Sequence, residues 1–95
     1  MTHRTNSKKV TINVTKKDIE QGRPYLGDSC AVALALGRAT RAKGVSVGYC
    51  STEFWTRDGR WHASNTQKLE RFVEDFDHGL SVKPVKFTLT FSRGH

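Results

Sequence analysis

The sequence predicts an α+β domain with the split β-α-β-β-α-β order of a ferredoxin-like fold, in which a four-stranded antiparallel sheet carries two helices on one face. Two observations favour it. Stretches that alternate apolar and polar residues, as strands do, are interleaved with stretches whose apolar residues recur at helical spacing. The chain has 95 residues, the size of one domain. We therefore assign residues 1–8 to a flexible basic arm and residues 9–95 to a single domain.

The first strand and a short helical turn come directly after the arm. Residues 10–14 alternate β-branched apolar side chains with polar ones, the pattern of a half-buried strand. Thr15 and Asp18 have the spacing of a capping box, which predicts one helical turn ended by Gly22.

A buried helix is predicted next. Asp28 or Ser29 can cap it, because either side chain accepts hydrogen bonds from the free N–H groups of a first turn. Residues 30–36 are apolar almost throughout, which predicts deep burial, and Gly44 supplies the C-cap. We interpret the basic residues near the end of this helix as compensation of its dipole rather than as a binding site; they are Arg38, Arg41 and Lys43.

Residues 45–50 alternate as a strand, and a hairpin follows it. Asp58 and Gly59 stand between two β-prone runs, which predicts a two-residue type I′ turn. This turn sets Arg57 opposite Arg60 and Trp55 opposite His62. One face of the hairpin then carries Phe54, Thr56, Trp61 and Ala63, and the other carries Trp55, Arg57, Arg60 and His62. The pattern leaves open which face points inward.

The last helix and strand have the clearest periodicity. Ser64 and Gln67 form a capping box, and Gly79 ends the helix. Its apolar residues share one helical face and are Leu69, Phe72, Val73 and Phe76, whereas we expect Glu70, Glu74, Asp75 and Asp77 on a solvated face. Residues 85–91 then alternate as a strand. In the split order the first and last strands are neighbours at the centre of the sheet, and their polar sides form a free face of Thr11, Asn13, Thr15, Lys86, Thr88, Thr90 and Ser92.

The formal net charge of +7 favours an anionic partner. Residues 1–44 hold nine Lys and Arg against three Asp and Glu, so the basic excess lies in this half. The predicted topology resembles that of RNA-recognition domains, which stack bases on sheet aromatics. Here the two central strands offer threonines on that face, and no segment matches the aromatic RNP1 consensus. We therefore expect contacts to phosphates rather than base stacking.

Three segments resemble a family of small uncharacterised proteins of actinobacterial phages, such as mycobacteriophages, and their hosts. The segments read VTINVTKKDIEQG, GDSCAVALALGRA and FVEDFDHGLSVKPVKFTLTF. The resemblance covers about two thirds of the chain, and it departs at Ala31, where members of the family often carry proline after the cysteine. It implies a phage product in a bacterial cytoplasm, and it implies no reaction.

Catalytic and metal sites were weighed against structural roles for the same residues. Cys30 at a helix start, with His62 or His78 as base, resembles a nucleophile, but a small buried residue in a first turn is the simpler interpretation. Cys30, Cys50, His62 and His78 fit no zinc spacing. No phosphate-loop, serine-elbow or zinc-protease motif is present. We predict no enzymatic activity, cofactor or metal. Without an apolar leader or a long apolar run, the expectation is a cytoplasmic protein, free of the membrane.

The sequence thus predicts a binding protein that contacts nucleic acid mainly through phosphates, as a monomer or weak homodimer. The alternative is a protein-interaction module that inhibits or redirects a host protein through the Trp/Arg hairpin, because Trp and Arg often dominate interfaces. The candidate binding residues for either partner are Trp55, Arg57, Arg60 and His62 of the hairpin, Arg4, Lys8 and Lys9 of the arm, and Lys86.

Overall fold

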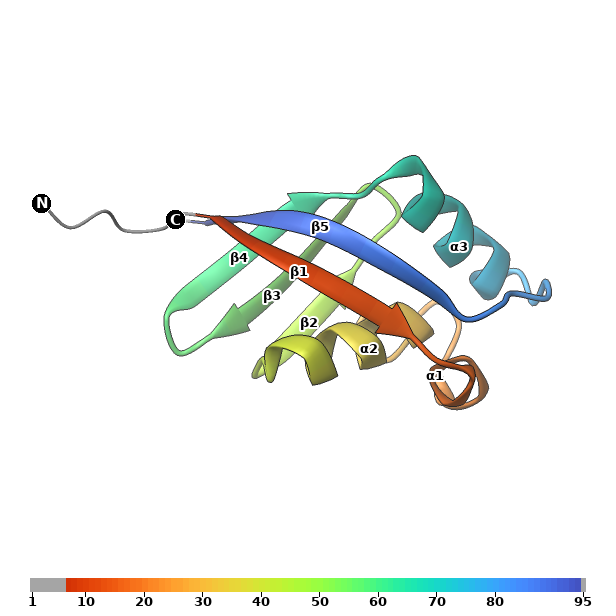
Figure 1. Cartoon of the computed structure of the whole chain (residues 1–95). Coiled ribbons are helices and arrows are strands. Elements are labelled where there is room, and N and C mark those ends of the chain that lie inside the picture. The colour runs from red at the N-terminus through yellow and green to blue at the C-terminus, as the bar shows by residue number, and fades with distance from the viewer. Residues whose placement is uncertain (1–6, 95) are drawn as a thin grey trace, which may run out of the picture.

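The computed structural model describes residues 7–94 and shows an α+β fold of one antiparallel sheet with three helices (Figure 1). The α+β class is therefore confirmed. In chain order the elements are β1 (Ser7–Val14), α1 (Lys16–Gln21), α2 (Ala31–Thr40), β2 (Gly44–Val47), β3 (Ser51–Thr56), β4 (Gly59–Ser64), α3 (Gln67–Asp77) and β5 (Val85–Arg93).

The strand count and order differ from the predicted ferredoxin-like split. The sheet has five strands in the order β1-β5-β4-β3-β2. The first and last strands are neighbours, as expected, but β1 lies at an edge of the sheet and not at its centre. The likeness to RNA-recognition domains, which rested on the four-stranded order, does not hold.

The fifth strand arises because the chain reverses after Val47 rather than running on into the hairpin. Gly48 N–H donates to the Ser51 carbonyl over 2.9 Å. Asn65, which follows β4, stabilises this turn through hydrogen bonds of its side chain. The Asn65 amide nitrogen donates to the carbonyls of Gly48 and Tyr49 over 2.7 and 3.0 Å. Its amide oxygen accepts from the buried Thr52 hydroxyl over 2.6 Å. A tight turn therefore separates β2 from β3.

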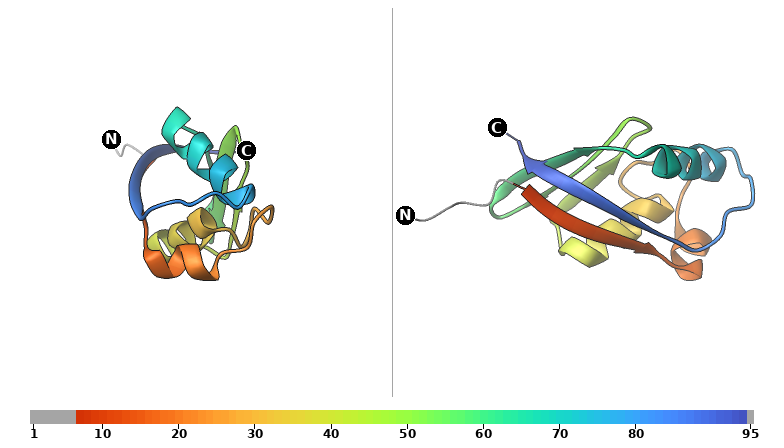
Figure 2. Two further views of the ribbon diagram at one scale, coloured as in Figure 1. Left: turned by 90° about the vertical axis from the view of Figure 1, so that its right-hand side faces the viewer. Right: turned by 45° about the horizontal axis from the view of Figure 1, so that its top comes forward.

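The sheet curls around its helices. β1 pairs with β5 from Ser7–Ser92 to Val14–Val85, whereas within residues 7–94 the pairs between β4 and β5 are Trp61–Arg93 and His62–Ser92. Beyond that corner the two strands diverge and α3 connects them. α2 packs against both edge strands, β1 and β2, so it closes the open side of the curl. In Figure 2, left, β5 lies on one side of the helices and the β2–β4 strands lie on the other.

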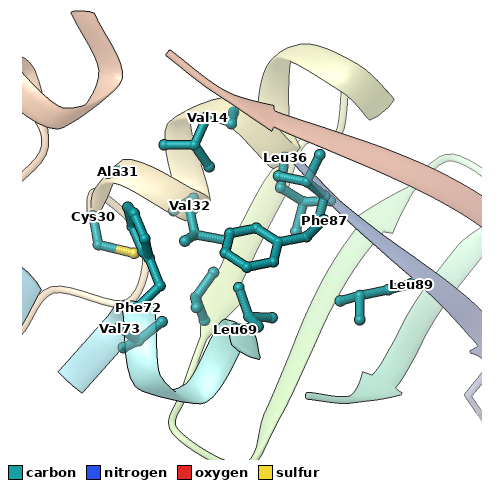
Figure 3. Packing of buried hydrophobic residues seen from close by; sticks show 14 of the residues in the cluster. Val14, Cys30, Ala31, Val32, Leu36, Leu69, Phe72, Val73, Phe87 and Leu89 are labelled. Atoms are coloured by element: carbon teal, nitrogen blue, oxygen red, sulfur yellow. The ribbon is translucent and has the colours of Figure 1, made fainter. Parts of the chain in front are cut away.

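The core fills the space inside the curl (Figure 3). Leu69 and Phe72 of α3 meet Phe87 of β5, with the Phe72 and Phe87 ring centroids 5.6 Å apart. At the other end, Phe54 packs edge-on against Phe91 at 4.8 Å. Strand alternation determines which residues point inward, so the predicted apolar sides of all the strands face this core.

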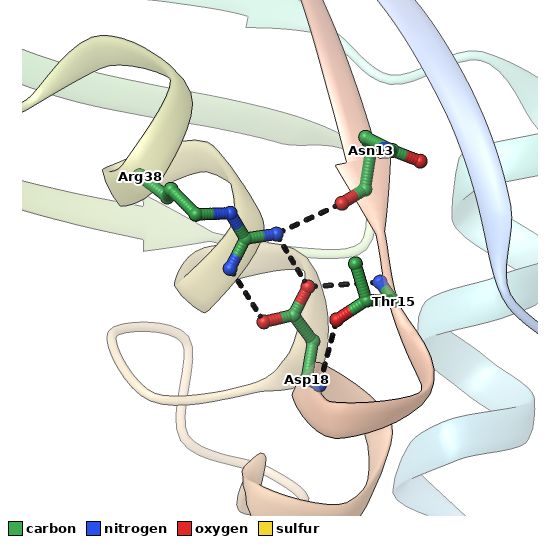
Figure 4. A network of polar contacts seen from close by, with 4 residues as sticks. All are labelled: Asn13, Thr15, Asp18 and Arg38. Carbon is green, nitrogen blue, oxygen red and sulfur yellow. Dashed lines mark hydrogen bonds and ion pairs between the residues drawn. The ribbon is translucent and has the colours of Figure 1, made fainter.

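The first helix is capped as predicted, and its cap extends into a polar network (Figure 4). Thr15 and Asp18 form both bonds of the capping box. Asp18 is buried, at 4% exposed, and the Arg38 guanidinium binds both of its oxygens over 2.9 and 2.7 Å. Arg38 also donates to the Asn13 carbonyl over 3.0 Å. Arg38 therefore joins α1, α2 and β1, a larger role than the predicted dipole compensation.

The caps of the longer helices lie elsewhere than predicted. The N-cap of α2 is Cys30, without a side-chain cap, and α2 ends at Arg41 in the left-handed region, φ 54°. Gly44 instead begins β2, where an added Cβ would lie 2.6 Å from the Trp55 ring. The helix α3 is capped by Thr66, not Ser64, because the chain stays extended through Ser64.

The hairpin has the predicted faces but not the predicted register. Thr56 pairs with Gly59, Trp55 with Arg60 and Phe54 with Trp61. The two loop residues are therefore Arg57 and Asp58, one position earlier than predicted. Gly59 has φ 131°, a conformation that suits glycine, and so ends the turn rather than occupying its centre.

Candidate nucleic-acid interface

The outer face of the sheet carries no helix, and its strand positions are polar and mostly exposed. Alternation decides which residues point there, because the inward positions of the same strands are apolar. The outward side chains are Lys9, Thr11 and Asn13 of β1, Lys86, Thr88, Thr90 and Ser92 of β5, Arg60, His62 and Ser64 of β4, and Glu53 and Trp55 of β3.

Arg60 and His62 form the basic part of this face on β4. The Arg60 Nε lies 3.7 Å from the Glu53 carboxylate, a largely exposed pair that contributes little to stability. The tail crosses beside these side chains, because Gly94 N–H donates to the Arg60 carbonyl over 2.7 Å. A Cβ on Gly94 would lie 3.0 Å from Arg60 and 3.3 Å from His62.

Trp55 is the cross-strand partner of Arg60, so its side chain lies on the same outer face beside this basic pair. Its ring covers Gly44 on the neighbouring strand, and the residue is 39% exposed. It lines a surface groove of about 600 Å³ with Tyr25 and Leu26 of the loop before α2 and with Lys43. Among the described residues, the cation–π contacts fall on Trp61 and Phe87, not on Trp55.

Of the predicted binding residues, Trp55, Arg60 and His62 share the outer face, and the others lie in several places. Arg57 lies in the turn and does not face Arg60. Lys9 and Lys86 lie on the outer face, as expected for a polar sheet surface. Lys8 belongs to β1 rather than to an arm, and it points to the inner side of the sheet. Arg4 lies outside the described residues.

A second cluster, which the sequence analysis missed, surrounds the buried Trp61. The Lys8 ammonium lies 4.6 Å from the ring centroid, and the Arg93 guanidinium lies 4.9 Å from it. Strand alternation could have predicted this cluster. Lys8 lies two residues before Val10, and Arg93 lies two residues after Phe91, so each points to the same side of its strand as that apolar residue.

The prediction that Asp77 lies on a solvated face is wrong, because the residue is buried, at 8% exposed. Its carboxylate accepts from the Tyr25 N–H over 2.9 Å and from the Tyr49 hydroxyl over 2.8 Å. The bond to Asp77 raises the pKa of Tyr49 to about 12, because ionising the phenol would set two negative charges side by side. Tyr25 has φ 65°, and the hydrogen bond from its N–H to Asp77 helps to hold this conformation.

Cys30 lines the small pocket beside Asp77, which measures about 120 Å³. The thiol is buried, and its burial raises its pKa, with Asp77 adding in the same direction. A reactive cysteine needs the opposite shift, since the thiolate is the nucleophile. The environment of Cys30 therefore favours the predicted packing role.

Two findings about the described residues concern other kinds of site. Within residues 7–94, no cluster of three or more His, Cys, Asp or Glu side chains is placed to hold a metal ion. No helix in that part of the chain combines the length and the apolar character that crossing a membrane requires.

Comparison with protein-family models, curated proteins and solved structures finds no match to this chain. The resemblance to phage proteins stays a prediction.

Proposed function

We propose that this protein binds nucleic acid without enzymatic activity, mainly through phosphate groups that lie across the outer face of the sheet. The observation that carries the proposal is the charge of that uncovered face. Lys9, Arg60 and Lys86 project from three strands, whereas the carboxylate among the outward strand residues, Glu53, is already paired with Arg60. Such a surface suits a row of phosphates, whose binding releases counterions.

Hydroxyl groups between the cations support the same partner. Thr11 pairs with Thr88 and Lys9 pairs with Thr90, so these hydroxyls lie in the same two strands as the Lys9 and Lys86 cations. Hydroxyl, Lys and Arg contacts to phosphate position a nucleic acid without reading its sequence. Trp55 offers one partly exposed ring, fewer than the two or three stacking aromatics of sheet-based RNA readers. The proposal is therefore binding with low sequence specificity.

The resemblance to actinobacterial phage proteins supplies the setting of the proposal. We take this binding to occur in a bacterial cytoplasm, where nucleic acid is abundant. The net charge of +7 favours attraction to such a polyanion.

Fluorescence anisotropy with labelled single-stranded RNA, single-stranded DNA and duplex DNA tests the proposal. The triple variant Lys9→Ala, Arg60→Ala, Lys86→Ala should bind about tenfold or more weakly at low salt, because it loses three phosphate contacts. The matched control, Lys16→Ala, Lys17→Ala, Arg71→Ala, removes the same charge from exposed helix positions. Equal losses in both variants, or no binding by the wild type at low salt, would refute the outer-face site.

A protein partner is the second candidate, and the groove beside Trp55 favours it. Tyr25, Leu26 and Trp55 are large, exposed and apolar, and all three line this groove. Recovery of one protein from bacterial lysate after nuclease treatment, lost on Trp55→Ala, would support this candidate. Recovery that nuclease abolishes would support the nucleic-acid proposal.

A further inference from the structure

The end of the curl where β1 begins and β5 ends brings two cationic side chains against one buried indole ring. Trp61 is 0% exposed and stacks on Phe54 with the ring centroids 6.4 Å apart. Lys8 and Arg93 approach the same indole, at 4.6 and 4.9 Å from its centroid. Two cations thus share one aromatic ring at the inner side of the sheet.

Within residues 7–94, no carboxylate pairs with either cation. The ion pairs among the described residues join Arg38 to Asp18 and Arg60 to Glu53, and they leave Lys8 and Arg93 without a carboxylate. The ring quadrupole attracts each cation, but the two positive charges repel one another. A negative charge close to both would relieve this repulsion.

Hydrogen bonding at the same place is also incomplete. The buried Trp61 Nε1 and Arg93 Nε have no acceptor among the groups of residues 7–94. Buried N–H groups without partners are rare in folded proteins and call for a water, an ion or a ligand. Both groups are donors, so the missing partner must be an acceptor.

A surface cavity lies next to this cluster. It measures about 390 Å³, and its lining includes Lys8 and Phe54, which both contact the Trp61 ring, together with Lys9 and Thr56. Its volume is in the range of small-ligand sites. Trp61 and Arg93 are not part of this lining, so a ligand in the cavity meets Lys8 first and reaches their N–H groups only where the exposed Lys8 side chain shifts on the ring.

We infer that this end of the curled sheet is a binding site for an oxyanion, a phosphate group or a carboxylate, held by the Trp61 and Arg93 N–H donors and the Lys8 ammonium. An oxyanion meets both deficiencies at once, because it supplies negative charge and several acceptor oxygens. Lys8 and Trp61 lie on the inner side of the sheet, whereas the proposed nucleic-acid surface faces outward and shares Lys9 with the cavity lining. The N–H donors belong to the inner side alone, so the inference does not rest on that function.

The indole N–H signals of the ¹⁵N-labelled protein test the site directly. The chain has two tryptophans, and Trp55→Phe leaves the Trp61 signal alone. Titration with inorganic phosphate, adenosine 5′-monophosphate or acetate, at constant ionic strength set with chloride, should move that signal downfield and saturate. A response to phosphate and the nucleotide assigns a phosphoryl ligand, and a response to acetate assigns a carboxylate. A Trp61 signal that moves by the same amount with every anion, in step with the falling chloride concentration, overturns the inference.

Two variants and a control complete the test. Lys8→Met keeps an unbranched stem over the ring and removes the charge, so phosphate or acetate should bind about tenfold more weakly. Arg93→Met should weaken binding at least as much, and a dispersed spectrum shows whether each variant is folded. Lys17→Met, on exposed α1, should bind as the wild type does. Wild-type affinity in a folded Lys8→Met protein would also overturn the inference.

Discussion

Asp18 shows how one residue can tie three elements together. Its carboxylate is buried, caps α1 through the Thr15 N–H and binds the Arg38 guanidinium with both oxygens. The bond to Arg38 holds the pKa of Asp18 below its ordinary value of 3.8, against the opposing effect of burial. The capping box was predictable from the spacing of Thr15 and Asp18. The Arg38 partner was not, since it lies twenty positions away.

Arg38→Met should destabilise the protein by about 1–3 kcal/mol near neutral pH, because it leaves the buried carboxylate without its main partner. Urea unfolding measures this loss. Arg71→Met is the control, as Arg71 is exposed on α3, and it should change stability by less than about 0.5 kcal/mol.

The same pair predicts a pH dependence. A carboxyl whose pKa is lower in the folded state contributes stability above its unfolded pKa, here about 3.8, and this contribution is lost as pH falls through the folded pKa. The wild type should therefore lose stability on acidification below about pH 4 more steeply than Arg38→Met. Parallel acid limbs for the two proteins would contradict this account.

At the scale of elements, the sequence predicted the strands and helices better than their boundaries. Period-two and helical patterns were sufficient because they reflect which side chains face the core. The hairpin register was wrong by one residue, since Asp58-Gly59 also fits a turn in which Gly59 comes last, with φ 131°. Gly44 looked like a helix cap, but its place is under the Trp55 ring, a contact that no local pattern reveals.

Gly59→Ala tests the observed turn. At φ 131° an alanine is strained, so the variant should lose about 1–3 kcal/mol of stability. Gly37→Ala is the matched control, because it lies inside α2 and an added Cβ meets nothing within 4 Å. It should gain about 0.5–1 kcal/mol from its better helix propensity. Equal effects of the two substitutions in thermal unfolding would argue against this turn.

Asn65→Ala tests the turn that separates β2 from β3. The change removes bonds to the Gly48 and Tyr49 carbonyls and leaves the buried Thr52 hydroxyl without its partner. We expect a loss of about 2–4 kcal/mol in urea unfolding. The control is Asn13→Ala, whose side chain is exposed on β1. A loss no larger than that of the control would show that the turn forms without Asn65.

At the scale of the whole molecule, strand order was the feature that sequence could not determine. The alternating pattern of β5 is the same whether β1 lies at the centre of the sheet or at its edge. The difference comes from the two-residue junction of β4 with β5 and from α2, which packs against both edge strands. The candidate site could not be fully predicted for the same reason. Its residues were selected because they are basic or aromatic, and residue type does not say on which side of the sheet a side chain lies. In the structure Lys8 points inward, whereas Lys9, Arg60 and Lys86 point outward.

The salt dependence of binding tests this whole-molecule arrangement of charge. If Lys9, Arg60 and Lys86 each contact one phosphate, the slope of log affinity against log salt for a single strand should become shallower by about 2 in the triple variant. The helix-side control variant keeps those contacts, so its slope should match that of the wild type although its net charge equals that of the triple variant. Anisotropy titrations across a salt series give the three slopes. Two variants with the same reduced slope would mean that binding responds to total charge alone, and the outer face would then have no particular role.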